Sequence, residues 1–246
     1  MTPLQKALRD LVVANRILAR EGVVDAYGHV SMRHPDNPEH YLLSRSRSPE
    51  LVEIGDIMEF DFEGRALGGD ARAPYLERFI HGGIYSKRPE INAVIHSHAD
   101  DVLPFSVCAN VPLRAVAHTA GCMGHHVPVW DIRHKFGDTN LLVTNVAQGL
   151  DLAGALAEHK AVLMSAHGFA ATGASLPEAV RIAIYLPKNA RVYLEALRLG
   201  EVRLLSPGEI EHKIITNPEA PEIWRAWEYW AMRAGCADLL EAPPMA

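Results

Sequence analysis

Hydrophobic residues recur along this chain with two spacings, one typical of helices and one typical of strands. Apolar positions near the N-terminus return every three or four residues, which predicts an amphipathic helix over 3–21. The mostly apolar run 91–98 predicts a buried strand. We expect further helices over 74–87, 100–108, 150–158, 175–199 and 221–234, and further strands over 23–32, 41–44, 57–62, 112–117, 127–129 and 161–167. This interleaving of strands and helices favours the α/β class.

Local start signals support two of these helices. Residues 2–5 (Thr-Pro-Leu-Gln) and 175–178 (Ser-Leu-Pro-Glu) each place a hydroxyl three positions before Gln or Glu, which is the spacing of a capping box. Because residues 2–5 begin a helix, we expect no signal peptide at this end of the sequence. We see no internal repeat or linker. We therefore predict a single domain over 1–246, with a C-terminal helical extension from about residue 208.

Composition narrows the class of protein. Of the 246 residues, 48% are apolar and 22% are charged, which suits one full hydrophobic core. The net charge of −6 and the lack of a basic cluster argue against a nucleic-acid partner. No apolar run reaches about 18 residues, so we expect no association with a membrane through a spanning helix. Three widely separated cysteines indicate a reducing compartment, and we therefore expect a cytoplasmic protein.

Three histidines suggest a metal site. Side chains on a strand alternate between its faces, so His96 and His98 point the same way. His167 ends a second apolar strand and can complete a facial set. Three protein ligands leave coordination positions open for a substrate, as in catalytic metal sites. The alternative is that each histidine is a hydrogen-bonded core residue, but two such imidazoles on one buried face would each need a partner.

Glu77 and His81 lie four residues apart on the helix expected before this strand, so they share a helix face. One hypothesis is that Glu77 points at the metal, as a ligand or as an acid/base. The alternative is a solvated glutamate and a surface histidine. Periodicity alone favours the second, whereas the position just before the two-histidine strand favours the first.

The chain resembles the class II aldolase/adducin-like family. The resemblance extends over most of the chain and rests on residues 27–31 (Tyr-Gly-His-Val-Ser), Glu77 with His81, residues 85–89 (Tyr-Ser-Lys-Arg-Pro), residues 93–98 (Ala-Val-Ile-His-Ser-His), residues 166–168 (Ala-His-Gly) and the helix after Ser175. It implies a three-layer α/β/α fold with a central, mainly antiparallel sheet. It also implies homotetramers with active sites at subunit boundaries.

The same resemblance assigns roles to the site residues. It implies one divalent metal ion per subunit, bound by His96, His98 and His167. Glu77 is then the acid/base and a candidate fourth ligand. Such a nitrogen-rich set suits Zn or Mn best, and it is compatible with Fe or Co.

The sequence departs from the sugar-phosphate aldolases of this family where they bind phosphate. A Gly-Asn pair is replaced by Gly28-His29, and a serine-rich loop by residues 44–49 (Ser-Arg-Ser-Arg-Ser-Pro). Paired serines before the glutamate are replaced by residues 74–76 (Pro-Tyr-Leu). Arginine presents a planar fork that matches a carboxylate. The substrate-binding candidates are therefore His29, Ser44, Arg45 and Arg47, although one of the two arginines can equally be a solvated loop residue.

These departures, together with residues 117–121 (Ala-His-Thr-Ala-Gly) and the aromatic segment 225–230, resemble the decarboxylase branch of the family. That branch includes hydroxy-methylpyridine-dicarboxylate and dihydroxyphthalate decarboxylases. It implies a lyase for a small carboxylate substrate, a hydroxylated aromatic or heteroaromatic (di)carboxylic acid that loses CO2 through a metal-stabilised enolate. The resemblance thus points to the catabolism of aromatic compounds.

Two further residues enter this hypothesis. Either Glu77 or His118 makes the proton transfer to the ring carbon, and His118 can reach the site from its own or a neighbouring subunit. Its alternative is a surface loop histidine. Tyr229 can cover the substrate pocket, although the aromatic residues around it favour core or subunit packing.

Two alternatives for the function remain at this point. One is an aldolase or epimerase for a sugar phosphate, of the fuculose-phosphate aldolase type. The other is a non-catalytic, adducin-like binding module, which the three retained histidines disfavour.

Overall fold

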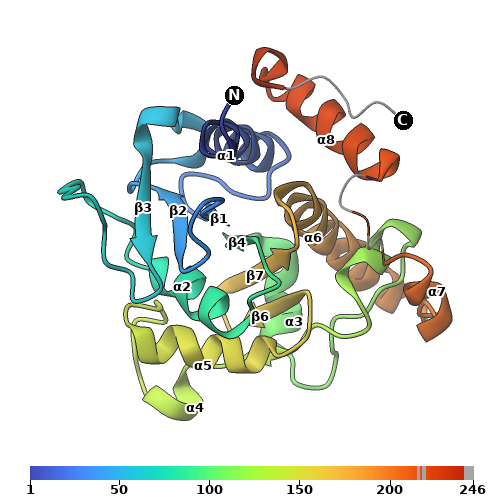
Figure 1. Ribbon diagram of the computed structural model, residues 1–246. Helices are drawn as coiled ribbons and strands as arrows, with labels where there is room; N and C mark the ends of the chain where they lie inside the picture. The colour runs from blue at the N-terminus through green and yellow to red at the C-terminus, as the bar shows by residue number, and fades with distance from the viewer. Residues whose placement is uncertain (215–216, 218–219, 241–246) are drawn as a thin grey trace.

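Seven strands form one sheet in the computed structural model, which describes residues 1–214, 217 and 220–240. The strand order is β3-β2-β1-β4-β7-β6-β5, and every neighbouring pair is antiparallel except β5 with β6 (Figure 1). The strands are β1 (His29–Arg33), β2 (His40–Ser44), β3 (Ile57–Asp61), β4 (Ala93–Ser97), β5 (Val129–Trp130), β6 (Ala161–Met164) and β7 (Gly168–Gly173). The expected mainly antiparallel sheet is confirmed.

Helices cover both faces of this sheet. Figure 1 shows α1 and α6 on one face and α2 and α5 on the other, with α8 outside α1 and α6. The α-helices are α1 (Pro3–Arg20), α2 (Arg78–Lys87), α3 (Leu103–Val107), α4 (Arg133–Phe136), α5 (Val146–Leu156), α6 (Leu176–Leu199), α7 (Pro207–Glu211) and α8 (Pro221–Arg233). Short 3-10 helices are η1 (Pro49–Leu51), η2 (Ile54–Asp56), η3 (Asp100–Val102), η4 (His118–Met123) and η5 (Ala237–Leu239). The three-layer α/β/α prediction is therefore confirmed.

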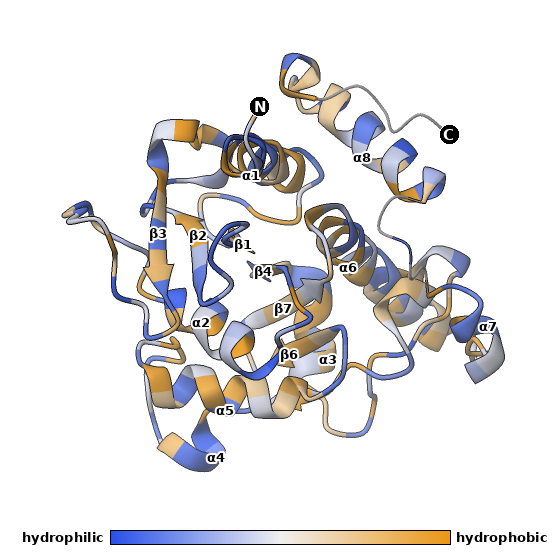
Figure 2. Ribbon diagram, in the orientation of Figure 1, coloured by the Kyte–Doolittle hydropathy of each residue, from blue (hydrophilic) through white to orange (hydrophobic). Residues whose placement is uncertain are grey.

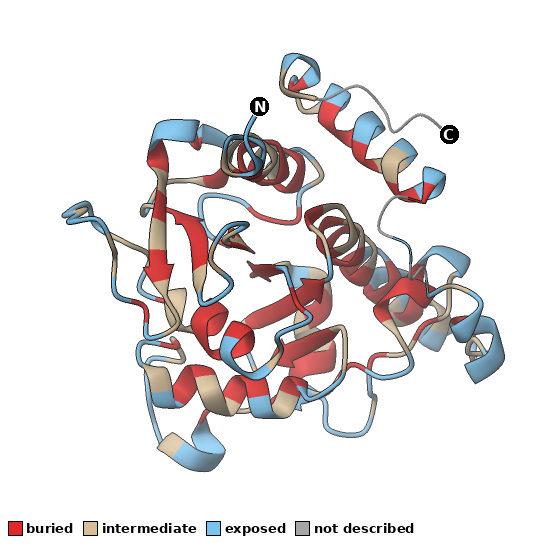
Figure 3. Cartoon of the chain, viewed as in Figure 1, coloured by how far each residue is buried: buried red, intermediate tan, exposed pale blue. Residues whose placement is uncertain are grey.

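The alternation of side chains along β4 divides the core in two. Ala93 and Ile95 pack into an apolar cluster with α1 and α6. Val94 packs into a second cluster with α2 and α5. Hydrophobic residues concentrate in the strands and on the helix faces toward the sheet (Figure 2), and the same positions are buried (Figure 3). A central strand covered on both faces in this way is nearly free of exposed side chains, which makes β4 a rigid support for the histidines that it carries.

Most predicted elements are present with shifted ends. The helices expected over 3–21, 175–199 and 221–234 match α1, α6 and α8 to within about a residue at each end. None of the helices in the described ranges is both long and apolar enough to cross a lipid bilayer.

Three of the predictions were wrong. The helix expected from Pro74 begins only at Arg78, because Pro74 instead forms a β-bridge with Arg45. The strand expected over 112–117 is absent, because the side chain of Asn189 accepts from the backbone N–H groups of Val116 and Ala117. The strand expected over 23–32 begins only at residue 29.

One strand was missed altogether. Its sequence, Gly-Phe-Ala-Ala-Thr-Gly, has few of the β-branched and aromatic residues that favour strands. Strand β7 forms because it lies between β4 and β6 and pairs with both. Its six residues are all buried.

Glycines let α2 and α5 pack backbone against backbone. A Cβ at Gly83 would lie 2.3 Å from the carbonyl group of Gly149, and a Cβ at Gly149 would lie 2.1 Å from the carbonyl oxygen of Phe79. No side chain fits at either distance. Because Glu77 immediately precedes α2, this close contact also fixes the height of Glu77 above the sheet.

We predict that Gly149→Ala lowers the free energy of unfolding by about 1–3 kcal/mol, because the added methyl forces α5 away from α2. Gly154 lies in the same helix, where a methyl group would have nothing within 4 Å, and it is the matched control. Gly154→Ala should raise the free energy of unfolding by roughly 0.5–1 kcal/mol through helix propensity. Urea denaturation of both variants at one protein concentration measures the difference, and equal effects would contradict the packing argument.

Candidate metal centre and active site

One carboxylate and three imidazoles converge at one end of the sheet. Ligand atoms of Glu77, His96, His98 and His167 all lie within 4.8 Å of one another. Nε2 of His98 is 2.9 Å from Nε2 of His96 and 3.0 Å from Nε2 of His167. Oε2 of Glu77 lies 3.4 Å from Nε2 of both His96 and His167, and 4.0 Å from Nε2 of His98.

Three separate segments supply these four groups. His96 lies in β4, and His98 follows the end of that strand. His167 lies in the turn between β6 and β7, and Glu77 precedes α2. Since β7 pairs with both β4 and β6, the turn that carries His167 is brought to the end of β4.

Hydrogen bonds to backbone carbonyls set the protonation of two imidazoles. Nδ1 of His96 lies 3.0 Å from the carbonyl oxygen of Phe169, and Nδ1 of His167 lies 3.0 Å from that of Leu141. A carbonyl only accepts, so each Nδ1 carries the proton and each Nε2 of the neutral ring presents a lone pair. This is the arrangement that orients metal-binding histidines.

The donor set therefore fits a cation. The Nε2 lone pairs of His96 and His167 face the third imidazole and an acidic oxygen at distances where they repel one another unless a proton or a metal ion lies between them. Three nitrogens and one oxygen suit a divalent transition-metal ion. The position of His98, whose side chain is 33% exposed, leaves this cluster open on one side.

Glu77 is held by both carboxylate oxygens. Oε1 accepts a 2.9 Å hydrogen bond from the backbone N–H of Val143, and Oε2 faces the imidazoles. Burial by itself would raise the pKa of Glu77, but the imidazoles of His96 and His167 outweigh it and hold that pKa below its usual range. Burial and the same two neighbours lower the pKa of His98 to about 4.

The backbone around His167 is unusual. Leu141, whose carbonyl accepts from His167, has φ 67°, and Ala166 has φ 57°. Residues other than glycine rarely adopt this left-handed backbone conformation. It costs of order 1–3 kcal/mol per residue, and such residues cluster at functional sites. Gly168 follows at a point where a Cβ would lie 2.1 Å from the carbonyl oxygen of Ser97. The turn is thus pressed tightly against the end of β4.

A cavity of about 340 Å³ opens beside the cluster. Glu77 and His98 form part of its wall. The remaining wall is contributed by residues 26–29, 46–48, 75–76 and 142. A cavity of this size suits a small molecule.

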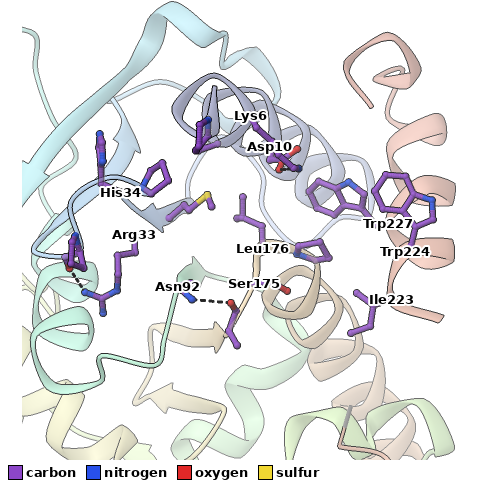
Figure 4. Close-up of a pocket in the computed structure, with 17 residues that line it drawn as sticks. Lys6, Asp10, Arg33, His34, Asn92, Ser175, Leu176, Ile223, Trp224 and Trp227 are labelled. Atoms are coloured by element: carbon purple, nitrogen blue, oxygen red, sulfur yellow. Dashed lines mark hydrogen bonds and ion pairs between the residues drawn. The ribbon is translucent and has the colours of Figure 1, made fainter. Parts of the chain in front are cut away.

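A larger cavity of about 770 Å³ lies elsewhere, between α1, the start of α6 and α8 (Figure 4). Trp224 and Trp227 of α8 face it, and Asn92 lines it from the start of β4. None of the four clustered groups lines it. Because His98 and Asn92 flank opposite ends of β4, the two cavities lie at opposite ends of this strand, and the smaller one, which Glu77 and His98 line, is the candidate active site.

The two loop arginines share a carboxylate that the sequence did not single out. Nε of Arg45 donates to Oδ1 of Asp56 at 2.6 Å, and an Nη of Arg47 donates to Oδ2 at 2.5 Å. Burial would raise the pKa of Asp56, but the N–H of Glu53 and the two guanidinium groups lower it overall, so Asp56 stays ionised. Arg47 lines the candidate active site, whereas Arg45 is not part of its wall.

Ser44 and Tyr75 lie behind this loop. Oγ of Ser44 is 3.4 Å from the hydroxyl of Tyr75, and that hydroxyl donates to the backbone carbonyl of Arg47. The Tyr75 ring contacts the His29 ring at a centroid distance of 4.6 Å. Ser44 is buried, so it reaches the cavity through Tyr75 rather than directly.

His29 lines the cavity and belongs to a buried polar chain. Its Nδ1 lies 2.6 Å from Nε2 of His81, whose Nδ1 lies 2.6 Å from Oγ of Ser31. Ser31 is in turn 2.8 Å from the hydroxyl of Tyr85. Burial, then His81 and His96, lower the pKa of His29 well below its usual value, and burial with His96 lowers that of His81 to about 3. Both rings are therefore neutral.

The structure around His81 differs from the sequence-based expectation in two ways. His81 is fully buried, so the surface-histidine alternative was wrong. Glu77 is not on the helix with His81, because it is the residue just before the first residue of α2. The alternation of β1 could have revealed the link, since it places His29 and Ser31 on one face.

His118 and Tyr229 lie outside the candidate active site of their own chain. They line a third cavity, of about 590 Å³, together with Arg181, Tyr185, Arg225 and other residues of α6 to α8. Tyr229 is 57% exposed, whereas Trp227 and Trp230 on the same helix are buried.

Known proteins share this architecture and much of this sequence. The decarboxylase tropJ of Talaromyces stipitatus is 33% identical, over 93% of this chain and 94% of that protein. A 5-methylthioribulose-1-phosphate/5-deoxyribulose-1-phosphate aldolase of Rhodospirillum rubrum is 29% identical, over 80% of this chain and 90% of that protein. A 3,4-dihydroxyphthalate decarboxylase of Arthrobacter keyseri is 28% identical, over 77% of this chain and 78% of that protein.

Solved structures share the fold. An aldolase II superfamily protein from Pseudomonas syringae superposes with a TM-score of 0.79 at 17% identity, over 97% of this chain and 96% of that one. The L-fuculose 1-phosphate aldolase of Glaciozyma antarctica superposes with a TM-score of 0.70 at 25% identity, over 93% and 86%. The family described as Class II Aldolase and Adducin N-terminal domain matches residues 9–194, about three quarters of the sequence. The chain therefore belongs to the class II aldolase and adducin family.

Proposed function

We propose that this protein is a metal-dependent lyase that decarboxylates a hydroxylated aromatic or heteroaromatic acid carrying a second carboxylate. One observation carries the proposal. The cluster of Glu77 and three histidines adjoins a cavity whose wall bears an imidazole, His29, and a guanidinium, Arg47. Those two groups suit a carboxylate.

The cluster supplies both a cation site and a proton carrier. His96, His98 and His167 would hold one divalent ion, Zn or Mn in preference to Fe or Co, with Glu77 as a candidate fourth ligand. When bound, that ion provides a Lewis acid for negative charge developing on a substrate oxygen. Because Val143 fixes one oxygen of Glu77, the other is presented to the cavity side of the cluster.

Proton movement then follows from the position of this carboxylate. Oε2 of Glu77 can take the proton of the substrate hydroxyl and return it to the ring carbon that bears the carboxylate. The bond from that carbon to the carboxylate breaks, CO2 leaves, and the electron pair passes through the ring to the hydroxyl oxygen, which takes a proton from solvent water. His118 is the second candidate for the transfer to carbon.

The substrate's other carboxylate needs a separate binding place. We assign it to His29 and Arg47, since both line the cavity. Arg45 contributes by holding Asp56, which keeps Arg47 in place, and Ser44 contributes through Tyr75. Of the two loop arginines, Arg47 is thus the one that contacts the substrate.

His118 and Tyr229 enter from another subunit in this proposal. On one chain they share a cavity that contains none of the cluster residues. Within a homotetramer, the same surface of a neighbouring chain would complete the active site, with His118 near the ring carbon and Tyr229 covering the pocket.

A sugar-phosphate aldolase is the second candidate function. Its support is the similarity to the Rhodospirillum rubrum aldolase over most of both chains. Against it stands the cavity wall, where an aromatic ring, Tyr75, and Leu76 precede Glu77. An adducin-like binding module without catalysis would have no need for the four converging groups.

We predict that purified protein loaded with Zn or Mn releases CO2 from ortho-hydroxy aromatic dicarboxylates. A chelator should abolish the release, and the same ion should restore it, because the ion provides the Lewis acid that the side chains of the cluster lack. CO2 release and metal content per chain are the measurements. Cleavage of fuculose- or ribulose-type phosphates, detected by carbonyl trapping, with no CO2 from any dicarboxylate would instead establish the aldolase.

We predict that Arg47→Ala raises KM for dicarboxylates about 10- to 100-fold, the loss expected for one charge-assisted hydrogen bond. Monocarboxylates lacking the second carboxylate should be affected much less. Arg45→Ala is the matched comparison: it removes the other partner of Asp56 but no part of the cavity wall, so it should raise KM for dicarboxylates less than Arg47→Ala does. Equal effects of Arg47→Ala on both substrate classes would reject the anion-binding role.

We predict that mixed oligomers of Glu77→Gln and His118→Ala chains recover activity that neither variant has alone. Recovery is expected because some sites then combine an intact Glu77 with an intact His118 from the neighbour. Co-expression with two affinity tags isolates the hybrids, and CO2 release measures them. Hybrids as inactive as the two parents would place both residues in one chain's site, or remove His118 from the mechanism if His118→Ala is itself fully active.

A further inference from the structure

The buried hydrogen-bonded chain behind His29 has a direction from donor to acceptor, and the group at its Tyr85 end determines that direction. Four side chains follow one another from the core to the cavity: Tyr85, Ser31, His81 and His29. Each link is 2.6–2.8 Å long, so each shares one proton. A hydroxyl and a neutral imidazole each have one proton to donate, so the protons point the same way along the chain unless a buried proton is left without an acceptor.

The tyrosine end favours one direction. Among the described residues, Ser31 is the one hydrogen-bond partner of the Tyr85 hydroxyl, so no second acceptor is available to the phenol proton. If Ser31 donated to Tyr85, the phenol proton would be buried without an acceptor, at a cost of about 1–3 kcal/mol. Tyr85 therefore donates to Ser31.

The remaining links follow from this one. With its oxygen accepting from Tyr85, Ser31 donates to Nδ1 of His81. His81 then carries its proton on Nε2 and donates it to Nδ1 of His29. Nδ1 of His29 is thereby an acceptor, and the proton of this neutral ring lies on Nε2, the nitrogen left for the cavity.

We propose that Ser31 and His81 are positioning residues that hold His29 in the Nε2–H form, so that it donates a hydrogen bond to a substrate carboxylate oxygen. This inference rests on the proposed function for the identity of the acceptor. In this form His29 selects between ligands. It binds a group that accepts a hydrogen bond, and it rejects a group that only donates one, such as an ammonium.

The arrangement also explains why a buried histidine is used instead of a charged residue. A neutral donor recognises the retained carboxylate without adding a positive charge next to the metal-binding imidazoles. The His29 and His96 rings are only 5.1 Å apart between centroids, so a cation at His29 would oppose a metal ion at His96. Orientation by a hydrogen-bonded chain supplies the donor without that repulsion.

Two variants in the same chain separate positioning from general damage. Ser31→Ala leaves Nδ1 of His81 without a donor, so both directions become open and His29 should become a mixture of tautomers. Tyr85→Phe removes a larger polar contact, yet Ser31 can still donate only to His81, so the Nε2–H form should persist. Ser31→Thr keeps the hydroxyl and should rescue Ser31→Ala.

The test is ¹⁵N NMR of histidine-labelled protein, with the His29 signals assigned by their loss in His29→Gln, combined with steady-state kinetics. Wild type and Tyr85→Phe should show a protonated Nε2 and a bare Nδ1 at His29. Ser31→Ala should show both tautomers and a KM for the dicarboxylate raised about tenfold, with kcat changed much less. Thr172→Val removes a buried hydroxyl of the same sheet that lies outside the chain, and should change neither.

Some results would overturn the inference. A wild-type His29 protonated on Nδ1, or a Ser31→Ala variant with an unchanged tautomer and KM, would do so. These outcomes are distinct from failure of the proposed function, because the NMR result needs no substrate. A protein that releases no CO2 but shows the Nε2–H form would keep the positioning and lose only the carboxylate as its acceptor.

Discussion

The repulsion among unprotonated imidazoles and a carboxylate is the constraint on which this structure depends. Nε2 of His98 lies 2.9 Å from Nε2 of His96 and 3.0 Å from Nε2 of His167, and an oxygen of Glu77 lies 3.4 Å from the latter two nitrogens. Such an assembly is stable only when a cation neutralises it and the scaffold keeps the groups from separating. Backbone carbonyls fix two of the rings, and the N–H of Val143 fixes the carboxylate.

The scaffold meets this constraint by close backbone packing. Gly149 lets α5 contact α2, and α2 sets the position of Glu77. Gly168 lets the turn with His167 lie against the end of β4. Ala166 in that turn and Leu141, whose carbonyl accepts from His167, both have left-handed conformations. Small residues and local strain are thus concentrated where three distant segments must converge, and a cluster built in this way has little freedom to open.

Around the cluster, the polar groups that face the cavity are held in place by other polar groups behind them. Asp56 holds both loop arginines, and Tyr75 connects Ser44 to the arginine loop. The hydrogen-bonded chain of His81, Ser31 and Tyr85 likewise holds the imidazole of His29. In each case a buried or half-buried partner sets the orientation of the group that faces the cavity. The substrate preference that we propose for this relative of aldolases and decarboxylases therefore depends on residues that do not touch the substrate.

Much of this architecture could be predicted from local patterns. Helix-start signals located α1 and α6, because caps act over three or four residues. The alternation of β4 placed His96 on one face, because a strand's period of two is fixed by its backbone. The resemblance to a known family supplied the three-layer fold and the four cluster residues, which the structure brings together. Strand β7 was missed because its small residues gain their strand conformation from two neighbours.

The sequence by itself determined helices α1, α6 and α8, the alternation of the central strand and the presence of three histidines and one glutamate of the right kind, since these depend on local geometry and on chemistry carried by single residues. The tertiary structure alone decided that Glu77 precedes its helix, that Asp56 pairs with both arginines, and that His81 connects His29 to Ser31. It also separated His118 from the cluster of its own chain. These outcomes depend on contacts between residues far apart in the sequence, and no local pattern encodes which distant polar group will satisfy another once both are buried.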